Sequence, residues 1–216
     1  FLLCCAVNLL LTSCVRQKYV VMDMVHHNPG EAMTESKFLD PSFLKKNEYG
    51  AKVFFLFEAA QFGIDWKSFD PSLFPDTTEA GRWVAEKAEI IHKKYDAAKK
   101  EDLQVYCMLD MLVLPSLLVE KHRTELTNEQ GKLDISKPYT QLCIRELMKE
   151  MFETFPQLDG LVIRTGETYL HDAPYYVGNH PVQNGMYDHI TLINLLREEV
   201  CERRNKKLFY RTWDMG

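Results

Sequence analysis

The sequence predicts an α/β fold of parallel β/α repeats, arranged as a partial (β/α)8 barrel with about five strands present. Short apolar runs alternate along the chain with longer segments whose apolar residues recur at helical spacing. Helical segments between successive strands indicate right-handed βαβ units and therefore a parallel sheet. The turn after the first predicted strand is HHNPGE, with Gly30 as its single glycine. An open dinucleotide-binding sheet usually has a glycine-rich turn there, so the barrel is favoured.

Strands are predicted where apolar and β-branched residues run together and then stop at turn-forming or charged residues. The acids that follow these runs, in chain order, are Glu31, Glu58, Asp110, Glu167 and Asp214. Because the carboxyl ends of parallel strands meet at one rim, these acids predict an acidic active face. The predicted strands cover residues 19–26, 51–57, 103–109, 160–164 and 207–213.

Helices are predicted between these strands from apolar residues at helical spacing. Asp76 stands three residues before Glu79, a capping-box-like pattern, so the first long helix is expected to start there. The basic run at residues 93–103 is interpreted as the solvated end of that helix. The apolar stripes are Val84, Ala88, Ile91, Tyr95 and Ala98, then Cys143, Leu147, Met151 and Phe155, and then Leu192, Leu196 and Val200.

Residues 1–14 are uncharged and apolar, and they are interpreted as a signal peptide. The segment is too short to span a bilayer, which needs roughly 20 residues. Its last four residues, 11–14, resemble the bacterial lipobox, in which the chain is cut before the cysteine and Cys14 is lipidated. That resemblance implies export across the inner membrane and a periplasmic or cell-surface lipoprotein, anchored in the membrane by acyl chains on Cys14. A buried strand is the alternative for this segment.

Residues 15–216 predict one domain, the N-terminal part of a barrel, because a complete barrel takes about 250 residues. We therefore expect a fragment, whose N-terminus is also truncated because no Met precedes Phe1.

A net charge of −5 with interspersed acids and bases argues against a nucleic-acid partner. Cys107, Cys143 and Cys201 lack CxxC spacing and are expected to be buried thiols. No HxH or HExxH spacing occurs, so neither a metal nor another cofactor is expected.

Three strings carry a resemblance to a known group of proteins: HHNPGE at residues 26–31, FPQLDGLVIRTGETY at 155–169 and KLFYRTWD at 207–214. Together with the lipobox they resemble the N-terminal part of secreted bacterial glycoside-hydrolase-like barrels, including α-glucuronidase-like proteins. The resemblance covers most of the chain after residue 14. It implies hydrolysis of glycosidic bonds in a polysaccharide or oligosaccharide. In the largest clan of retaining barrel glycosidases an Asn precedes the strand-four acid, whereas Gly166 precedes Glu167 here.

Such hydrolysis needs two carboxyl groups beside the glycosidic oxygen, one protonated and one ionised. Glu167 is the favoured general acid, because desolvation near apolar walls raises the pKa of a carboxyl group. Asp110 and Asp214 are the candidate second carboxylates, since neighbouring strands lie about 4.8 Å apart. The alternative for Glu167 is a structural ion pair with Arg164 or Arg211.

The candidate substrate-binding residues share side chains that hydrogen-bond or stack on a sugar. Tyrosines in the loop after the fourth strand equally predict packing of that loop onto the barrel. Arg164 and Arg211 have the geometry to grip a uronic carboxylate, or to form ion pairs with the acidic rim. The predicted substrate-binding residues are His26, Asn28, Glu31, Arg164, Tyr169, His171, Asn179, Arg211 and Trp213.

Two functions of other kinds stay open. A non-catalytic surface glycan-binding barrel would bind sugars without releasing product, and a barrel lyase or isomerase would use metal-assisted proton abstraction. Nucleophile-elbow, P-loop and kinase motifs are missing from the sequence, and the predicted strands two to five lack a strand-end lysine for Schiff-base chemistry.

Overall fold

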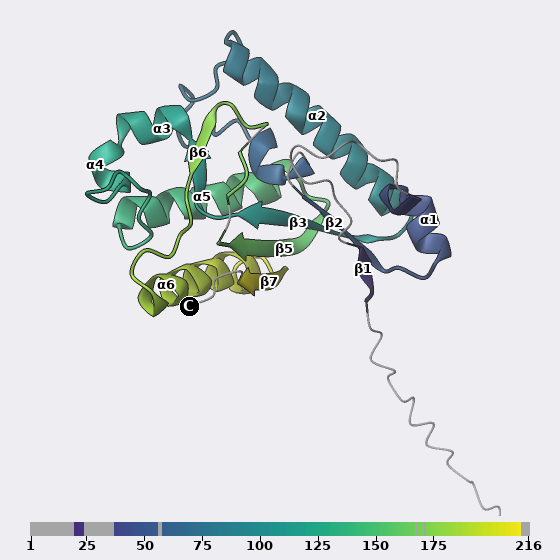
Figure 1. The fold of residues 1–216 in the computed structure, drawn as a ribbon. Helices are drawn as coiled ribbons and strands as arrows, with labels where there is room; N and C mark the ends of the chain where they lie inside the picture. The colour runs from purple at the N-terminus through teal and green to yellow at the C-terminus, as the bar shows by residue number, and fades with distance from the viewer. Residues whose placement is uncertain (1–19, 24–36, 56–57, 167, 171, 213–216) are drawn as a thin grey trace, which may run out of the picture.

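The computed structural model describes residues 20–23, 37–55, 58–166, 168–170 and 172–212 (Figure 1). In this part of the chain the main sheet has five parallel strands, in the order β1-β2-β3-β5-β7. The strands of this sheet stand in chain order, so each pairs with the next strand of the same sheet, and β1 and β7 form the two edges. The strands are β1 Met22–Asp23, β2 Ala51–Phe54, β3 Gln104–Asp110, β5 Leu158–Thr165 and β7 Lys207–Thr212.

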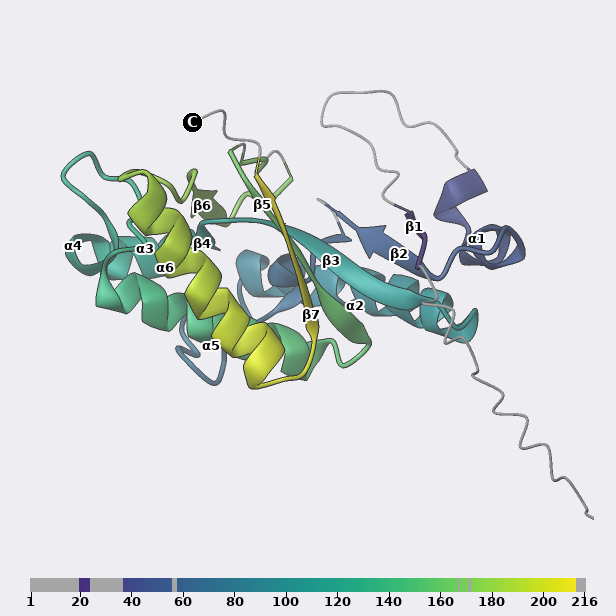
Figure 2. The same ribbon diagram turned by 90° about the horizontal axis from the view of Figure 1, so that it is seen from below.

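The long helices lie on one side of this sheet (Figures 1 and 2). They are α2 Glu79–Lys100, α5 Pro138–Thr154 and α6 Met186–Leu196, and their buried side chains share one large core with Val105 and Cys107 of β3. Right-handed crossovers between strands in chain order put every helix on the same face, as in a barrel, whereas a doubly wound sheet has helices on both faces. The predicted partial (β/α)8 barrel is therefore confirmed.

The opposite face of the sheet, called the inner face here, carries a smaller cluster of buried residues. Side chains alternate along a strand, so Tyr106 and Met108 of β3 and Val162 of β5 point away from the helices. These three residues pack with Ala51, Val53 and Phe55 from the second strand and its end. In a barrel this face encloses the interior, and its upper edge at the carboxyl ends of the strands is the active face.

The predicted elements are found at similar positions, with one correction at the start of α2. Thr78, not Asp76, caps this helix, and its hydroxyl accepts a hydrogen bond from the backbone N–H of Gly81 at 3.0 Å. Asp76 instead forms an exposed ion pair with Lys67 at 3.1 Å. The helix continues to Lys100, so most of the basic run is its solvated end, as expected.

A short antiparallel ribbon was not predicted from the pattern. Strand β4, Val113–Pro115, pairs with β6, Tyr176–Gly178, and thereby joins the loop after β3 to the loop after β5. Both strands are too short for periodicity to identify them. The short helical segments of the connections are η1 Lys37–Leu39, α1 Pro41–Lys46, η3 Ala60–Gly63, α3 Ser116–Lys121, α4 Arg123–Leu126 and η4 Arg197–Glu202.

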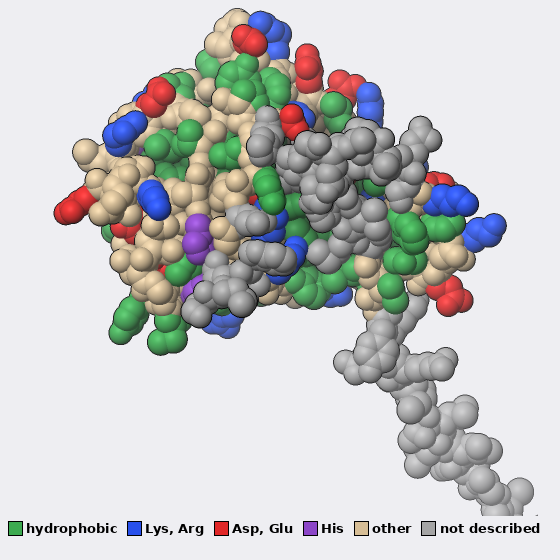
Figure 3. All heavy atoms as spheres, in the orientation of Figure 1, with side chains coloured by type: hydrophobic (Ala, Val, Ile, Leu, Met, Phe, Trp, Pro, Cys, Tyr) green, Lys and Arg blue, Asp and Glu red, His purple; other side chains and the backbone are tan. Residues whose placement is uncertain are grey.

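The surface is mixed in charge, with one exposed apolar stripe. Lysine, arginine and acidic side chains are interspersed on the face shown in Figure 3. Along α6, Met186, Tyr187, Ile190 and Ile193 are exposed at helical spacing. This stripe lies outside the core, so α6 offers an apolar flank to solvent.

Candidate functional site

Three charged side chains are neighbours across the inner face where β3, β5 and β7 end. The strand register pairs Asp110 with Arg164, and Arg164 with Arg211. Asp110 and Arg164 each stand two positions after a residue of the inner-face cluster, Met108 and Val162, so their side chains share that face. We call Asp110, Arg164 and Arg211 the charged row.

Asp110 and Arg164 form a buried bidentate ion pair. The Arg164 Nε donates to Oδ1 of Asp110 at 2.5 Å, and Nη2 donates to Oδ2 at 2.7 Å. The backbone N–H of Tyr169 donates a further hydrogen bond to Oδ2 at 2.8 Å. Asp110 is 4% exposed and Arg164 is 6% exposed. Two parallel charge-assisted hydrogen bonds fix the plane of the guanidinium as well as its position.

Two aromatic rings flank this guanidinium. The Arg164 Cζ lies 4.8 Å from the ring centroid of Phe55 and 4.5 Å from that of Tyr169. Both distances are within the range of cation–π attraction. Phe55 follows β2 and Tyr169 belongs to the loop after β5, so contributions from three strand ends meet here. Tyr169 thus lies in the candidate site, and its role in binding substrate stays a prediction.

The contacts of Asp110 favour a positioning role over a direct catalytic one. An ionised carboxylate has about four lone-pair positions. The bonds from Arg164 and Tyr169 use three of them. Ion pairing between the rim arginines and the rim acids was the alternative to substrate binding for Arg164, and this pair matches that alternative. Catalysis by Asp110 stays a prediction that these contacts do not favour.

Arg211 and Asn179 have different surroundings. Arg211 is half-buried beside Arg164 on β7, so it belongs to the rim as expected. The Asn179 Oδ1 accepts a hydrogen bond from the N–H of Leu133 at 2.7 Å, and its Nδ2 donates to the Leu133 carbonyl at 3.0 Å. Asn179 therefore fastens the end of β6 to the loop around Leu133, which is a structural role that sequence reasoning missed.

The remaining predicted site residues lie outside the described residues. Glu167 falls between Arg164 and Tyr169 in the chain, both of which contact Asp110. Asp214 stands three positions after Arg211. The others in this group are His26, Asn28, Glu31, His171, Trp213 and the predicted lipidation site Cys14.

Glu58 is a correction to the predicted acidic rim. Its carboxylate forms an ion pair with Lys94 of α2, on the helix side of the sheet. The carbonyl of Glu58 accepts a hydrogen bond from the Tyr95 hydroxyl at 2.9 Å. The Glu58 side chain therefore lies toward the helices, which its position in the sequence did not reveal.

Tyr176, Cys107 and Cys143 are buried, as one of the interpretations anticipated, whereas Cys201, also expected to be buried, is only partly buried. Tyr176 is buried, and its ring centroid lies 5.0 Å from that of Phe62 and 5.7 Å from that of Phe74. Burial also raises the pKa of the Cys107 and Cys143 thiols to about 12. A thiol with so high a pKa is a poor nucleophile at neutral pH.

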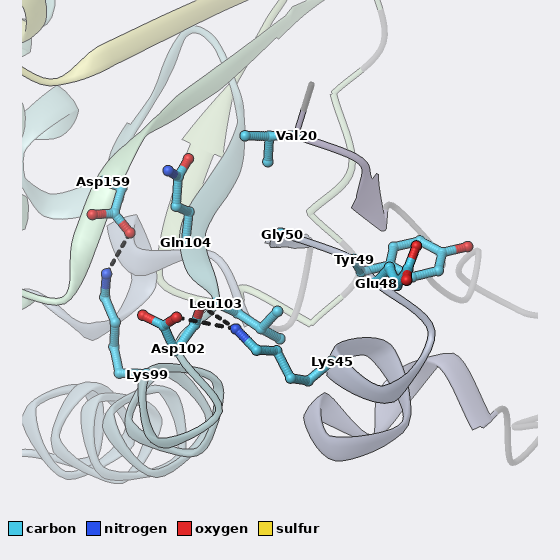
Figure 4. A pocket seen from close by; sticks show the side chains of 10 residues that line it. All are labelled: Val20, Lys45, Glu48, Tyr49, Gly50, Lys99, Asp102, Leu103, Gln104 and Asp159. Atoms are coloured by element: carbon cyan, nitrogen blue, oxygen red, sulfur yellow. Dashed lines mark hydrogen bonds and ion pairs between the residues drawn. The ribbon is translucent and has the colours of Figure 1, made fainter. Parts of the chain in front are cut away.

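A cavity of about 760 Å³ lies at the opposite end of the sheet (Figure 4). Gly50, Gln104 and Asp159, near the starts of β2, β3 and β5, contribute to its lining. Ion pairs of Lys99 with Asp159 and of Lys45 with Asp102 lie beside it. Residues at this end of a barrel contribute to stability, whereas catalytic residues lie at the carboxyl ends of the strands. The candidate site is therefore the charged row and not this larger cavity.

Metal-binding clusters and membrane spans are both missing from the described part of the chain. Among those residues, no group of three or more His, Cys, Asp and Glu side chains is placed to hold a metal ion. None of the helices described is both long enough and apolar enough to cross a membrane.

No protein-family model and no curated protein sequence matches this chain. Among solved structures, it is similar to a GH138 enzyme targeting pectin rhamnogalacturonan II, with 16% identity and a TM-score of 0.39 over 61% of this chain and 14% of that one. It is similar to the maltogenic α-amylase AmyB from Thermotoga neapolitana, with 13% identity and a TM-score of 0.45 over 80% of this chain and 39% of that one. It is also similar to the galactosidase domain of the α-galactosidase-sucrose kinase AgaSK, with 12% identity and a TM-score of 0.46 over 81% of this chain and 24% of that one.

The chain therefore spans between 14% and 39% of the length of these structures. At this level of likeness, it is the strand order and the one-sided helices of the chain itself that establish the barrel arrangement.

Proposed function

We propose that this chain is part of a barrel enzyme that hydrolyses glycosidic bonds in a polysaccharide or oligosaccharide by means of paired carboxylates. The charged row carries this proposal. Asp110, Arg164 and Arg211 stand together on the inner face at the carboxyl ends of three neighbouring strands. Barrel enzymes place their catalytic groups at this position.

Glu167 is the proposed general acid. Its neighbours in the chain support this assignment, because the Arg164 guanidinium and the Tyr169 backbone N–H both bind the carboxylate of Asp110 at the rim. In its protonated form Glu167 would donate a proton to the departing glycosidic oxygen.

Asp214 is the proposed second carboxylate, and Asp110 positions Arg164. Asp214 follows Arg211 at the end of the neighbouring strand β7. Carboxyl groups about 5 to 5.5 Å apart would retain the anomeric configuration, whereas a separation of about 6.5 to 9.5 Å would leave room for a water molecule and invert it.

The proposed substrate contacts combine ring stacking with charge. Tyr169 presents an aromatic ring beside the charged row, and a sugar has apolar C–H faces that pack on such rings. Arg211 is half-buried, so it combines partial access to solvent with a charge suited to an acidic sugar. The proposed binding partner is a carbohydrate and not a nucleic acid.

We also propose that the protein works as a lipoprotein at the bacterial cell surface or in the periplasm, anchored through Cys14. The lipobox-like residues 11–14 support this location. Metabolic labelling with a fatty-acid analogue would mark the wild-type protein, and Cys14→Ala would lose the label. Equal labelling of both proteins would remove the anchor from the proposal.

The experiment for the hydrolase compares Glu167→Gln with Glu58→Gln. Turnover is followed as reducing sugar released from a panel of oligosaccharides, with thermal unfolding measured alongside. Loss of the general acid is expected to lower kcat by about 10² to 10⁴ without changing the unfolding temperature. Glu58 pairs with Lys94 on the helix side, so its substitution is expected to keep turnover near the wild-type level. Equal activity of Glu167→Gln and wild type would overturn the assignment of Glu167.

A second candidate function is a non-catalytic glycan-binding barrel. The observation in its favour is that Asp110, a rim acid, is already occupied by Arg164 and Tyr169. Isothermal calorimetry would then show glycan binding by the wild type with no product in the same sample.

A further inference from the structure

Gln61 has a buried amide oxygen without a hydrogen-bond partner among the described residues. The residue lies in η3, in the connection between β2 and α2, and is 2% exposed. Its backbone carbonyl accepts a hydrogen bond from the Tyr176 hydroxyl at 3.3 Å, whereas its side-chain oxygen accepts none. A buried acceptor that loses its hydrogen bond to water and gains no other is costly, so this atom requires an explanation.

Gln61 lines a small cavity that also reaches the charged row. The cavity has a volume of about 10 Å³. A single water molecule needs about 10 to 15 Å³ by the same kind of measure. A sugar ring is far larger, so this space belongs to the support of the site and not to its substrate-binding surface. The cavity is lined by Phe55, Ala59, Gln61, Phe62, Met108, Asp110 and Tyr169.

Gln61 and Asp110 are the two side chains of this lining that present an amide or carboxylate oxygen as acceptor. Oδ2 of Asp110 accepts two hydrogen bonds, from Arg164 and Tyr169, and Oδ1 accepts one, from Arg164. Oδ1 therefore keeps one lone-pair position, and Oε1 of Gln61 keeps both of its own. A ligand for this pair must donate one hydrogen bond to each oxygen and be no larger than water. A divalent cation such as Mg²⁺ or Ca²⁺ takes six or more oxygens, which these two side chains do not supply.

We propose that an ordered water molecule binds in this cavity and donates one hydrogen bond to Oε1 of Gln61 and the other to Oδ1 of Asp110. A bridging water is nearly as favourable in enthalpy as a direct hydrogen bond. The bridge joins the turn after β2 to the Asp110–Arg164 pair. Gln61 is thereby a positioning residue for this pair, and the proposal does not depend on which reaction the rim performs.

A high-resolution crystal structure of the whole chain tests this directly. The expected result is one well-ordered density peak at hydrogen-bond distance, about 2.8 Å, from both Oε1 of Gln61 and Oδ1 of Asp110. A map with no peak there overturns the proposal. A direct hydrogen bond between the Gln61 amide and Asp110 overturns it as well, since the acceptor would then need no water.

Two matched variants test whether the water depends on Gln61 itself or on any buried glutamine. Gln61→Met has a similar volume but no strong acceptor, so the density peak is expected to disappear. Gln157 is the control, because its Oε1 is also buried without a partner while the residue does not line this cavity. Gln157→Met is therefore expected to keep the peak. Persistence of the peak in Gln61→Met would show that Gln61 does not hold the water.

A solution measurement covers the case in which Gln61→Met does not crystallise. Relaxation dispersion of the oxygen-17 signal of water counts long-lived internal water molecules. The count for Gln61→Met is expected to be one lower than for the wild type. Equal counts for the two proteins would overturn the proposal.

Discussion

The two faces of the sheet are held together by different forces. On the helix side, large side chains such as Trp66, Tyr95 and Phe155 are fully buried in one continuous core. On the inner face a small apolar cluster leads up to a charged pair, Asp110 and Arg164. Burial of apolar surface is non-directional, whereas the charged pair depends on hydrogen-bond geometry.

This difference separates the parts of the molecule that stabilise the fold from the parts available for chemistry. A buried ion pair contributes little net stability compared with apolar residues of similar volume, because both charges lose their hydration. It holds a polar group in a fixed place. On the inner face, Asp110 and Arg164 therefore fix charged side chains at the carboxyl ends of the strands. The apolar core on the helix side stabilises the fold.

On the helix side, Phe155→Ala is expected to cause the largest loss of stability. Phe155 is 0% exposed, and its ring lies 4.6 Å from that of His92 and 5.6 Å from that of Tyr95. Removing such a ring leaves a cavity and is expected to cost about 3 to 5 kcal/mol. Urea unfolding monitored by circular dichroism measures this loss. Phe209→Ala, a partly exposed aromatic residue of β7 on the inner face, is the control and should cost clearly less.

The inner face is tested by Arg164→Met, alone and combined with Asp110→Asn. The single substitution leaves the Asp110 carboxylate buried without its partner and is expected to lower the free energy of unfolding by about 3 to 5 kcal/mol. The double substitution removes both charges, so much of that loss should be recovered. If the double variant is as unstable as the single one, the pair contributes to stability in its own right, contrary to the comparison of the two faces.

A smaller effect is expected at the start of α2, where Thr78→Ala is compared with Asp76→Ala. Thr78 accepts the hydrogen bond from Gly81 that caps the helix, so its loss should cost about 1 kcal/mol. Asp76 forms only an exposed ion pair with Lys67, which predicts a change below about 0.5 kcal/mol. Thermal unfolding of both variants measures the difference. A larger loss for Asp76→Ala would restore it as the cap.

The smallest expected effect is a pH dependence of stability that comes from Asp70, in the loop before α2. Hydrogen bonds from Lys121 and Ser72 lower the pKa of Asp70 to about 2. This pKa is below the ordinary value of about 3.9, so the ionised group stabilises the folded state above about pH 4, and the contribution is lost as the pH falls toward 2. We expect about 1 kcal/mol to disappear in this range, allowing for partial solvent exposure. Asp70→Asn should flatten the pH dependence of unfolding there, and an unchanged slope would contradict this assignment.

Sequence patterns were sufficient to predict the order of strands and helices, because both repeat their apolar residues at periods set by local backbone geometry. The positions of Asp110, Arg164 and Arg211 at strand ends followed from the same periods. The pairing of Asp110 with Arg164 could not be predicted in this way, since the two residues are 54 positions apart in the chain and meet only through the register between β3 and β5.

The tertiary structure alone decided which way the rim side chains turn. Glu58 and Asp110 look alike in sequence, each an acid after a buried strand, yet one pairs with Lys94 among the helices and the other with Arg164 on the inner face. Asn179 and Gln61 likewise acquire their surroundings only when distant loops meet. The physical reason is that the apolar period of a strand is a local property of the backbone, whereas the partner of a polar side chain is chosen by whatever the packed loops bring within hydrogen-bond distance.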